Sequence, residues 1–145
     1  MFKRILIATD GSDLAHKAVA TGLALAKRLE AEVVAVTATE PWTGMTNGEG
    51  FAFNFPIEEY EKSCSEQAER TLAGVRKETQ ELGLTCDTVH VNDFPADAIL
   101  ATSQARNCDL IVMASHGRRG LSRLLLGSQA TRVVTMSAIP VLICR

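Results

Sequence analysis

The sequence predicts an α/β domain in which five parallel strands form a doubly wound sheet with helices on both faces. Five short apolar runs alternate along the chain with longer segments whose apolar residues recur at spacings of three and four, the period of a helix. The runs are apolar at nearly every position, which is typical of strands buried on both faces of a parallel sheet. Strands that alternate with helices in this way are joined by right-handed crossovers.

The first half of the chain supplies two strands and two helices. Phe2 to Ala8 is a near-continuous apolar run, and Glu32 to Thr37 is the second run. Between them, Asp13 can cap a helix that continues to about Glu30. Apolar residues from Ile57 to Leu82 predict a long helix, and Gly83 is a natural stop for it.

The second half supplies the remaining three strands and two helices. Cys86 to Val91 predicts the third strand, and Pro95 suits the first turn of a helix that ends near Arg106. Asp109 to Ala114 is the most apolar run and predicts the fourth strand. Ser128 opens a short helix to about Met136, and Pro140 to Cys144 predicts the fifth strand.

Composition and charge exclude several classes of protein. The chain is 46% hydrophobic and 22% charged, and we expect residues 1–145 to form one globular domain. Its net charge is −2 without a basic block, so nucleic acid is not expected as a partner. The apolar run at the start is too short for a signal peptide, and no apolar stretch approaches the roughly 18 residues of a membrane span. We therefore expect a soluble, cytoplasmic protein with no membrane partner.

The cysteines and histidines do not predict a metal site. The four cysteines and three histidines are scattered, with no C-x-x-C pair and no zinc-ligand spacing. We expect reduced thiols that lie mostly in the interior.

Small polar residues gather in the loops that follow the first and fourth strands. Ligands of open parallel sheets bind outside the carboxyl ends of the strands, where the strand order reverses direction. Asp10 follows the first strand and is placed to hydrogen-bond a ligand or to help hold a cation. His116 follows the fourth strand and either packs within its loop or donates to a phosphate. Arg118 and Arg119 in that loop either neutralise phosphate charge or are solvated.

Gly127 and Ser128 begin the helix that follows this loop. Glycine lets a ligand approach the backbone closely, and the free N–H groups of a first helical turn favour an anion. Ser128 can cap the helix or donate its hydroxyl to a phosphate. The purely structural alternative is that Gly127 ends the preceding turn and Ser128 caps the helix.

Three stretches of the chain resemble the universal stress protein family. They are ILIATDGSD near the start, DLIVMASHGRRGLSRLLLGS in the middle and IPVLICR at the end, so the resemblance spans the whole chain. The nucleotide-binding branch of that family carries Gly-x-x-Gly, nine residues, then Gly followed by Ser or Thr. Gly117, nine residues and Gly127-Ser128 match this motif, whereas Ala114 replaces its first glycine.

The resemblance implies the strand order 3-2-1-4-5 and an adenine nucleotide, ATP or AMP, with Mg²⁺ or Mn²⁺ held through the phosphates. It implies that Asp10 and the backbone near Val36 meet the adenine and ribose, and that Met113 and Ala114 lie beneath the ribose. Gly117, Gly127, Ser128, Gln129 and Ala130 would hold the phosphates. The complete set of candidate binding residues is Ala8, Asp10, Val36, Met113, Ala114, His116, Gly117, Gly127, Ser128, Gln129 and Ala130.

Catalysis is not expected beyond slow ATP hydrolysis. The chain has no G-x-x-x-x-G-K-[ST] loop and no evident base for a water molecule, so we expect at most a slow ATPase. A Ser-His-Asp hydrolase is disfavoured because no G-x-S-x-G elbow is present. The main alternative is a dimeric interaction module of the same fold that binds no nucleotide.

Two further expectations concern the surface. Val141, Leu142 and Ile143 form an apolar last strand with no following helix to cover it, which predicts a homodimer paired through this strand. The long segment 38–56 carries Trp42 and three of the five phenylalanines, and we predict a flap near the crevice. Its aromatic side chains either cover a bound base or pack on the following helix.

Overall fold

The computed structural model describes residues 1–42, 56–117 and 125–145. Its five parallel strands form one sheet in the order β3-β2-β1-β4-β5, which confirms the predicted order. Ile5 pairs with Leu110, so the first and fourth strands are neighbours and the strand order reverses between them. The strands are β1 (Arg4–Ala8), β2 (Glu32–Thr39), β3 (Cys86–Asn92), β4 (Leu110–Ala114) and β5 (Val141–Cys144).

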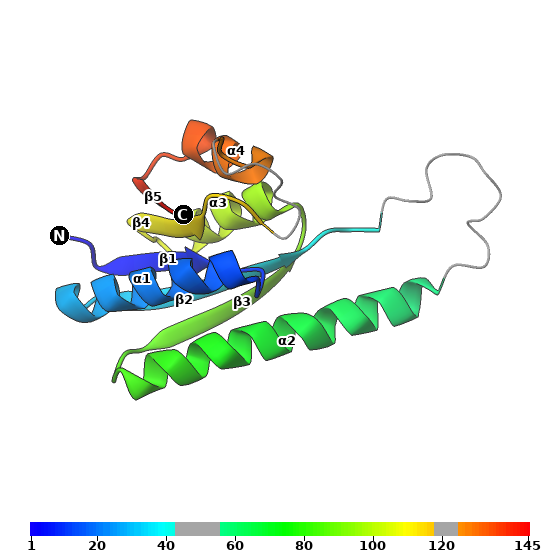
Figure 1. Ribbon diagram of the computed structural model, residues 1–145, viewed down its shortest axis with the longest axis horizontal. Helices are drawn as coiled ribbons and strands as arrows, with labels where there is room; N and C mark the ends of the chain where they lie inside the picture. Colours follow the sequence, from blue (N-terminus) through cyan, green and yellow to red (C-terminus); the bar gives the residue numbers. More distant parts are fainter. Residues whose placement is uncertain (43–55, 118–124) are drawn as a thin grey trace.

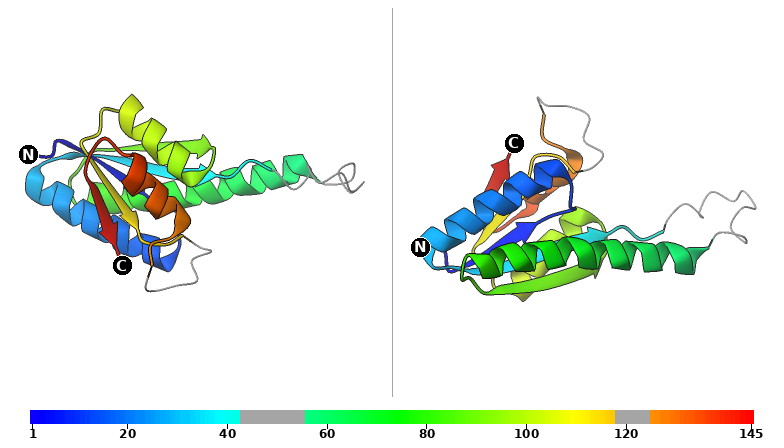
Figure 2. Two further views of the ribbon diagram at one scale, coloured as in Figure 1. Left: turned by 90° about the horizontal axis from the view of Figure 1, so that it is seen from above. Right: turned by 60° about the horizontal axis from the view of Figure 1, so that its bottom comes forward.

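Helices cover both faces of the sheet, as predicted. One face is covered by the first two helices and the opposite face by the other two (Figures 1 and 2). No helix within the described residues is both long and apolar enough to cross a membrane. The helices are α1 (Asp13–Leu29), α2 (Ile57–Glu81), α3 (Pro95–Ala105) and α4 (Ser128–Met136).

Successive residues of a strand face opposite layers of the core, which explains why the strands are continuously apolar. Ile5 and Ile7 of β1 are fully buried among side chains of α1, whereas Leu6 is fully buried on the α3 and α4 face. Both faces of β1 are therefore in hydrophobic contact, and each such side chain contributes about 1.5–3 kcal/mol by its burial.

The ends of the helices partly differ from the predictions. Ser12, and not Asp13, is the N-cap of α1, since its side chain accepts a hydrogen bond from the backbone N–H of Ala15. Asp13 is instead the first helical residue, where its negative charge favours the helix N-terminus. At the end of α2, Gly83 has the positive φ of 72° expected of a stop.

All five strands differ from the predicted runs by one or two residues, and β1 and β2 differ most. β1 begins at Arg4 rather than Phe2. β2 continues two residues beyond Thr37 because β3 pairs with it along this length, with Thr39 opposite Asn92. The described part of 38–56 therefore begins as a strand.

The first turns of α2 project beyond the end of the sheet (Figure 1). Two contacts join these turns to the chain after β2. The Tyr60 hydroxyl donates to the Glu40 carbonyl at 3.1 Å, and the rings of Tyr60 and Trp42 pack edge-on with their centroids 5.3 Å apart. Trp42 thus packs on α2, in line with the second of the two alternatives for the aromatic residues. Residues 43–55, which hold the rest of the predicted flap, lie outside the described residues.

Candidate ligand-binding site at the carboxyl ends of the strands

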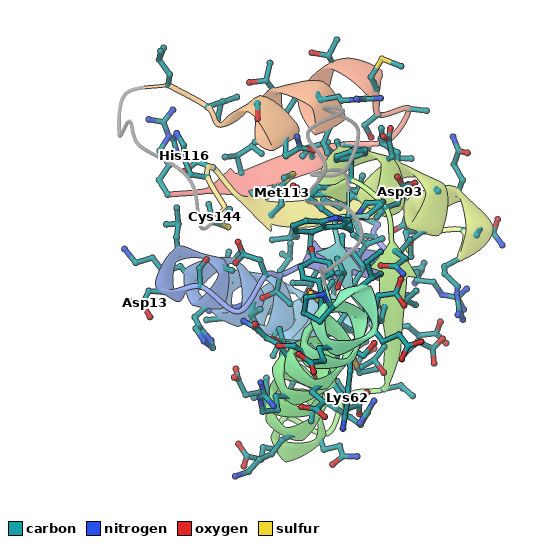
Figure 3. All side chains as sticks on the ribbon, turned by 90° about the vertical axis from the view of Figure 1, so that its right-hand side faces the viewer. Asp13, Lys62, Asp93, Met113, His116 and Cys144 are labelled. Carbon is teal, nitrogen blue, oxygen red and sulfur yellow. The ribbon has the colours of Figure 1, made fainter. Side chains whose placement is uncertain are left out.

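A cavity of about 950 Å³ lies at the carboxyl ends of β1, β2 and β4. Its remaining wall comes from α2 and from the N-terminal ends of α3 and α4. Figure 3 looks onto this end of the sheet, with Met113 and His116 between α4 above and α1 and α2 below. The cavity is lined by all of the residues selected from the sequence: Ala8, Asp10, Val36, Met113, Ala114, His116, Gly117, Gly127, Ser128, Gln129 and Ala130.

The turn after β1 brings Asp10 against the loop after β4. One carboxylate oxygen of Asp10 accepts the backbone N–H of Ser12 at 2.9 Å. A Cβ atom added to Gly117 would lie 3.2 Å from the other oxygen, Oδ2. Because Gly117 has no side chain, the two loops approach each other closely, and they converge on one crevice as the strand order requires.

Gly127 brings a further stretch of backbone to the same place. Its N–H donates to the Ser115 carbonyl at 2.8 Å. A Cβ atom on Gly127 would lie 3.0 Å from that carbonyl oxygen and 3.3 Å from Cδ2 of His116. Its φ is −62°, so close approach, and not a left-handed conformation, accounts for the glycine. His116 also lies 3.1 Å from the Ser115 hydroxyl through Nδ1, so it does pack within its loop.

The N-terminus of α4 opens into the cavity without a side-chain cap. Gly127 is the N-cap residue, and no side chain accepts a hydrogen bond there. Of the two alternatives for Ser128, capping of the helix is therefore wrong, because Ser128 is the first residue inside it. The first N–H groups of a helix have no acceptor within the helix. In α4 they belong to Ser128, Gln129 and Ala130, which all line the cavity, so this end of the helix can bind an anion.

Gln129 has a structural role that the sequence did not reveal. Its side-chain oxygen accepts the backbone N–H of Ala96 in the first turn of α3 at 2.9 Å. One turn later, Arg132 forms an ion pair with Asp97 at 2.8 Å. The amide oxygen of Gln129 is therefore already engaged, and its backbone N–H is the group that remains available to a ligand.

Ala114 occupies the place of the first motif glycine without backbone strain. It is the last residue of β4 and pairs with Cys144 of β5, so its backbone is extended. An alanine adopts this conformation as readily as a glycine. Its methyl group is largely buried and belongs to the core layer beneath α1.

The described wall of the cavity carries little positive charge. It contains the carboxylates of Asp10 and Glu40 and the imidazole of His116, and no lysine or arginine among the described residues. Arg118 and Arg119, for which phosphate contact was considered, lie outside the described residues. In the part of the chain that is described, no three His, Cys, Asp or Glu side chains are grouped so as to hold a metal ion.

The side of the cavity formed by α2 was not predicted. The α2 residues that line the cavity recur at helical spacing, so the sequence indicated that they lie on one face of the helix. It did not indicate which element that face covers. Only the position of α2 across the end of β2 identifies it. The residues concerned are Tyr60, Cys64, Gln67, Ala68 and Thr71.

The whole chain, residues 1–145, matches the family model described as the Universal stress protein family. The protein belongs to the universal stress protein family. Among curated relatives, universal stress protein MJ0531 of Methanocaldococcus jannaschii is 33% identical, with 100% of this chain and 83% of the relative covered. Universal stress protein YxiE of Bacillus subtilis is 32% identical, with both chains covered completely.

Solved structures of universal stress proteins share the fold. The structure of MJ0577 from Methanocaldococcus jannaschii has a TM-score of 0.80 at 27% identity, covering 99% of this chain and 96% of that one. A universal stress protein in complex with cAMP has a TM-score of 0.74 at 21% identity, covering 99% and 97%. One from Archaeoglobus fulgidus in complex with dAMP has a TM-score of 0.72 at 18% identity, covering 99% and 98%. For the cAMP and dAMP complexes, whose identities to this chain are 21% and 18%, the similarity establishes the fold alone.

Proposed function

We propose that this universal stress protein is a cytoplasmic stress-response regulator whose single domain, residues 1–145, binds an adenine nucleotide, ATP or AMP. One observation carries the proposal: the uncapped N-terminus of α4 opens into a cavity that all of the motif residues line. The first-turn N–H groups and the helix dipole suit a phosphate group there.

The shape of the crevice also suits a nucleotide. Its volume of about 950 Å³ lies in the upper part of the range for small-molecule sites. Apolar side chains from three strands, Ala8, Val36 and Met113, line it beside the polar turn at Asp10. A base and ribose placed against these side chains would direct their phosphates towards α4. The neighbours of the same fold in complex with cAMP and dAMP support an adenine ligand.

The described wall of the cavity has few side chains that could catalyse ATP hydrolysis, so we expect slow turnover at most. Among the described residues it holds no lysine or arginine to stabilise a transferring phosphoryl group, and its carboxylates are those of Asp10 and Glu40. We therefore propose retention of the nucleotide, with little or slow hydrolysis. A Mg²⁺ or Mn²⁺ ion would be held through the phosphates, and the carboxylate of Asp10 lies beside the motif glycine Gly117.

A pair of variants at Ser128 tests the phosphate site. Ser128→Asp places a negative charge at the start of α4, where the helix dipole favours it by about 0.3–1 kcal/mol. The same charge repels a phosphate, so we expect ATP affinity to fall at least about tenfold while thermal stability is kept or raised. Ser128→Asn has nearly the same shape without the charge and is the matched control. Calorimetry with ATP and a melting curve for each variant give both quantities.

The same experiment separates the proposal from the interaction-module alternative. If the parent protein binds neither ATP nor AMP in calorimetry with Mg²⁺ present, the module without nucleotide is the better interpretation. If ATP binds equally to the parent and to both Ser128 variants, the phosphates lie away from α4.

A further inference from the structure

A second cavity, of about 450 Å³, lies in a groove between α1 and α2. It adjoins the nucleotide cavity, and Thr9, Gln67 and Thr71 line both. None of the candidate nucleotide-binding residues lines the groove. Its remaining residues are Gly11, His16, Val19, Arg70, Gly74, Val75 and Glu78.

Gly74 lacks a structural reason within the described residues. Glycine is the least favourable residue in a helix interior after proline, and Gly74 lies in the middle of α2. A Cβ atom built there would meet nothing within 4 Å. Gly22 of α1 is the contrasting case, because its Cβ would lie 2.6 Å from Cδ1 of the buried Ile7. Packing therefore requires Gly22, whereas Gly74 leaves open space in the groove.

Hydrogen-bond donors gather at one end of this open space. Arg70 and His16 line it from the two helices, beside the side chains of Gln67 and Thr71. Within the described residues, neither Arg70 nor His16 forms a hydrogen bond or an ion pair through its side chain. Arg76, one and a half turns further along α2, bonds to Thr88 and pairs with Glu69.

Among the described residues that line the groove, the carboxylate is that of Glu78, and it lies away from Arg70. Glu78 is eight residues beyond Arg70 on the same face of α2, about 12 Å along the helix axis. The donor end thus has a net positive character when a ligand is absent. A guanidinium, an imidazole and a hydroxyl that line the same groove suit an anion with several acceptor oxygens.

We propose that the α1–α2 groove is a binding site for a small phosphate-type oxyanion. The anion is held by Arg70 and His16, with the hydroxyl of Thr71 as a further donor. The space beside Gly74 accommodates the remainder of a phosphorylated small molecule. The groove adjoins the proposed nucleotide site, but Arg70 and His16 line only the groove, so the proposal does not depend on nucleotide binding.

The three histidines allow the two sites to be followed independently. His16 lines the groove, His116 lines the nucleotide cavity, and His90 is hydrogen-bonded to Thr39 near the ends of β2 and β3. In a titration with inorganic phosphate at constant ionic strength, we expect the NMR signals of the His16 ring to shift and saturate while those of His90 stay in place. A titration with AMP tests the nucleotide site separately through His116. Signals of His16 that do not respond to phosphate would overturn the proposal, whatever His116 does.

Matched variants identify the residues responsible. We expect Arg70→Gln to weaken phosphate binding at His16 at least about tenfold, as the loss of a charged hydrogen bond predicts. Arg28→Gln removes an equal charge from the last turn of α1, away from the groove, and should change nothing. Gly74→Leu should fill the groove and abolish binding, whereas Ala73→Leu, exposed on the neighbouring face of α2, should not.

Gly74→Ala separates helix stability from binding. It removes the helical penalty of glycine without a clash, so the melting temperature should rise while the binding of inorganic phosphate stays close to that of the parent. Equal phosphate binding in the parent, Arg70→Gln and Gly74→Leu would show that the groove is not the site.

Discussion

The two motif glycines act at the scale of single atoms. Gly117 lies against the carboxylate of Asp10, and Gly127 lies against Ser115 and His116. A Cβ atom on either glycine would make an unusually tight contact with these neighbours. Because contacts within the protein already explain these glycines, their presence alone does not show that a ligand binds there. Replacing Gly127 with valine would strain the loop as well as obstruct a phosphate, so Ser128 is the cleaner position to vary.

Cys64 provides a residue-scale test of the cavity. It lines the cavity from α2 and is partly exposed. We expect a maleimide at pH 8 to modify Cys64, and saturating AMP to slow this reaction severalfold because the nucleotide covers the thiol. Labelling rates can be measured by mass spectrometry of the digested protein.

Two other thiols serve as internal controls. Burial raises the pKa of the Cys108 thiol from 9.0 to about 11, and burial also raises the pKa of Cys86. Because the thiolate is the reactive form, Cys108 should stay unmodified at pH 8 with or without AMP. A Cys64 rate that AMP leaves unchanged would place the nucleotide outside this cavity.

At the scale of elements, the site depends on how α4 is fixed to α3. Gln129 and Arg132, one turn apart on α4, bond to the first turn of α3 through Ala96 and Asp97. The N-termini of both helices are thereby held at the same wall of the cavity. The N-terminal end of α4, where we propose that phosphate binds, thus takes its position from the helix beside it and not from its own loop alone.

Removal of the Gln129 side-chain oxygen should therefore cost stability. Gln129→Ala leaves the N–H of the fully buried Ala96 without its acceptor, which costs about 1–3 kcal/mol of unfolding free energy. Gln129→Glu keeps an acceptor, so its urea midpoint should stay close to that of the parent. Its added charge near the start of α4 should nevertheless weaken ATP binding in calorimetry. Equal urea midpoints for the parent and Gln129→Ala would refute this role.

At the scale of the whole molecule, the sheet has two different edges. β3 is one edge strand and is largely polar, whereas β5 is the other and is apolar. Leu142 of β5 is 36% exposed, and Val134 and Met136 of the adjacent α4 are also exposed. An apolar edge strand with exposed apolar neighbours is suited to pairing with a second copy about a two-fold axis. We propose that the homodimer forms through Val141, Leu142 and Ile143.

A charge on this edge should separate the dimer. We expect Leu142→Arg to shift the protein from dimer to monomer at micromolar concentration in sedimentation velocity, because two like charges would face each other across the axis. Asn92→Arg, exposed on the β3 edge, is the control and should leave the dimer intact. A parent protein that sediments as a monomer would exclude the homodimer.

Much of the fold could be predicted because its signals are local. The strands are short apolar runs, and in β1 each of Ile5, Leu6, Ile7 and Ala8 belongs to one of the two core layers. Gly83 has the positive φ that its position after α2 predicted. Asp10 and His116 could be selected because the carboxyl ends of parallel strands share one edge. The strand order and several other residues of the crevice, such as Met113 and Gln129, came from the resemblance to the family.

By itself, the sequence determined the number and type of the elements, the edge of the sheet at which polar loops gather, and the resemblance to a family. Only the tertiary structure decided that Ser12 caps α1, that Gln129 bonds to α3, that α2 closes the cavity beside β2, and that Gly74 opens onto a groove. The physical reason is the range of each interaction. Hydrophobic periodicity and backbone preference act within a few residues, whereas these contacts depend on the distance between elements far apart in the chain.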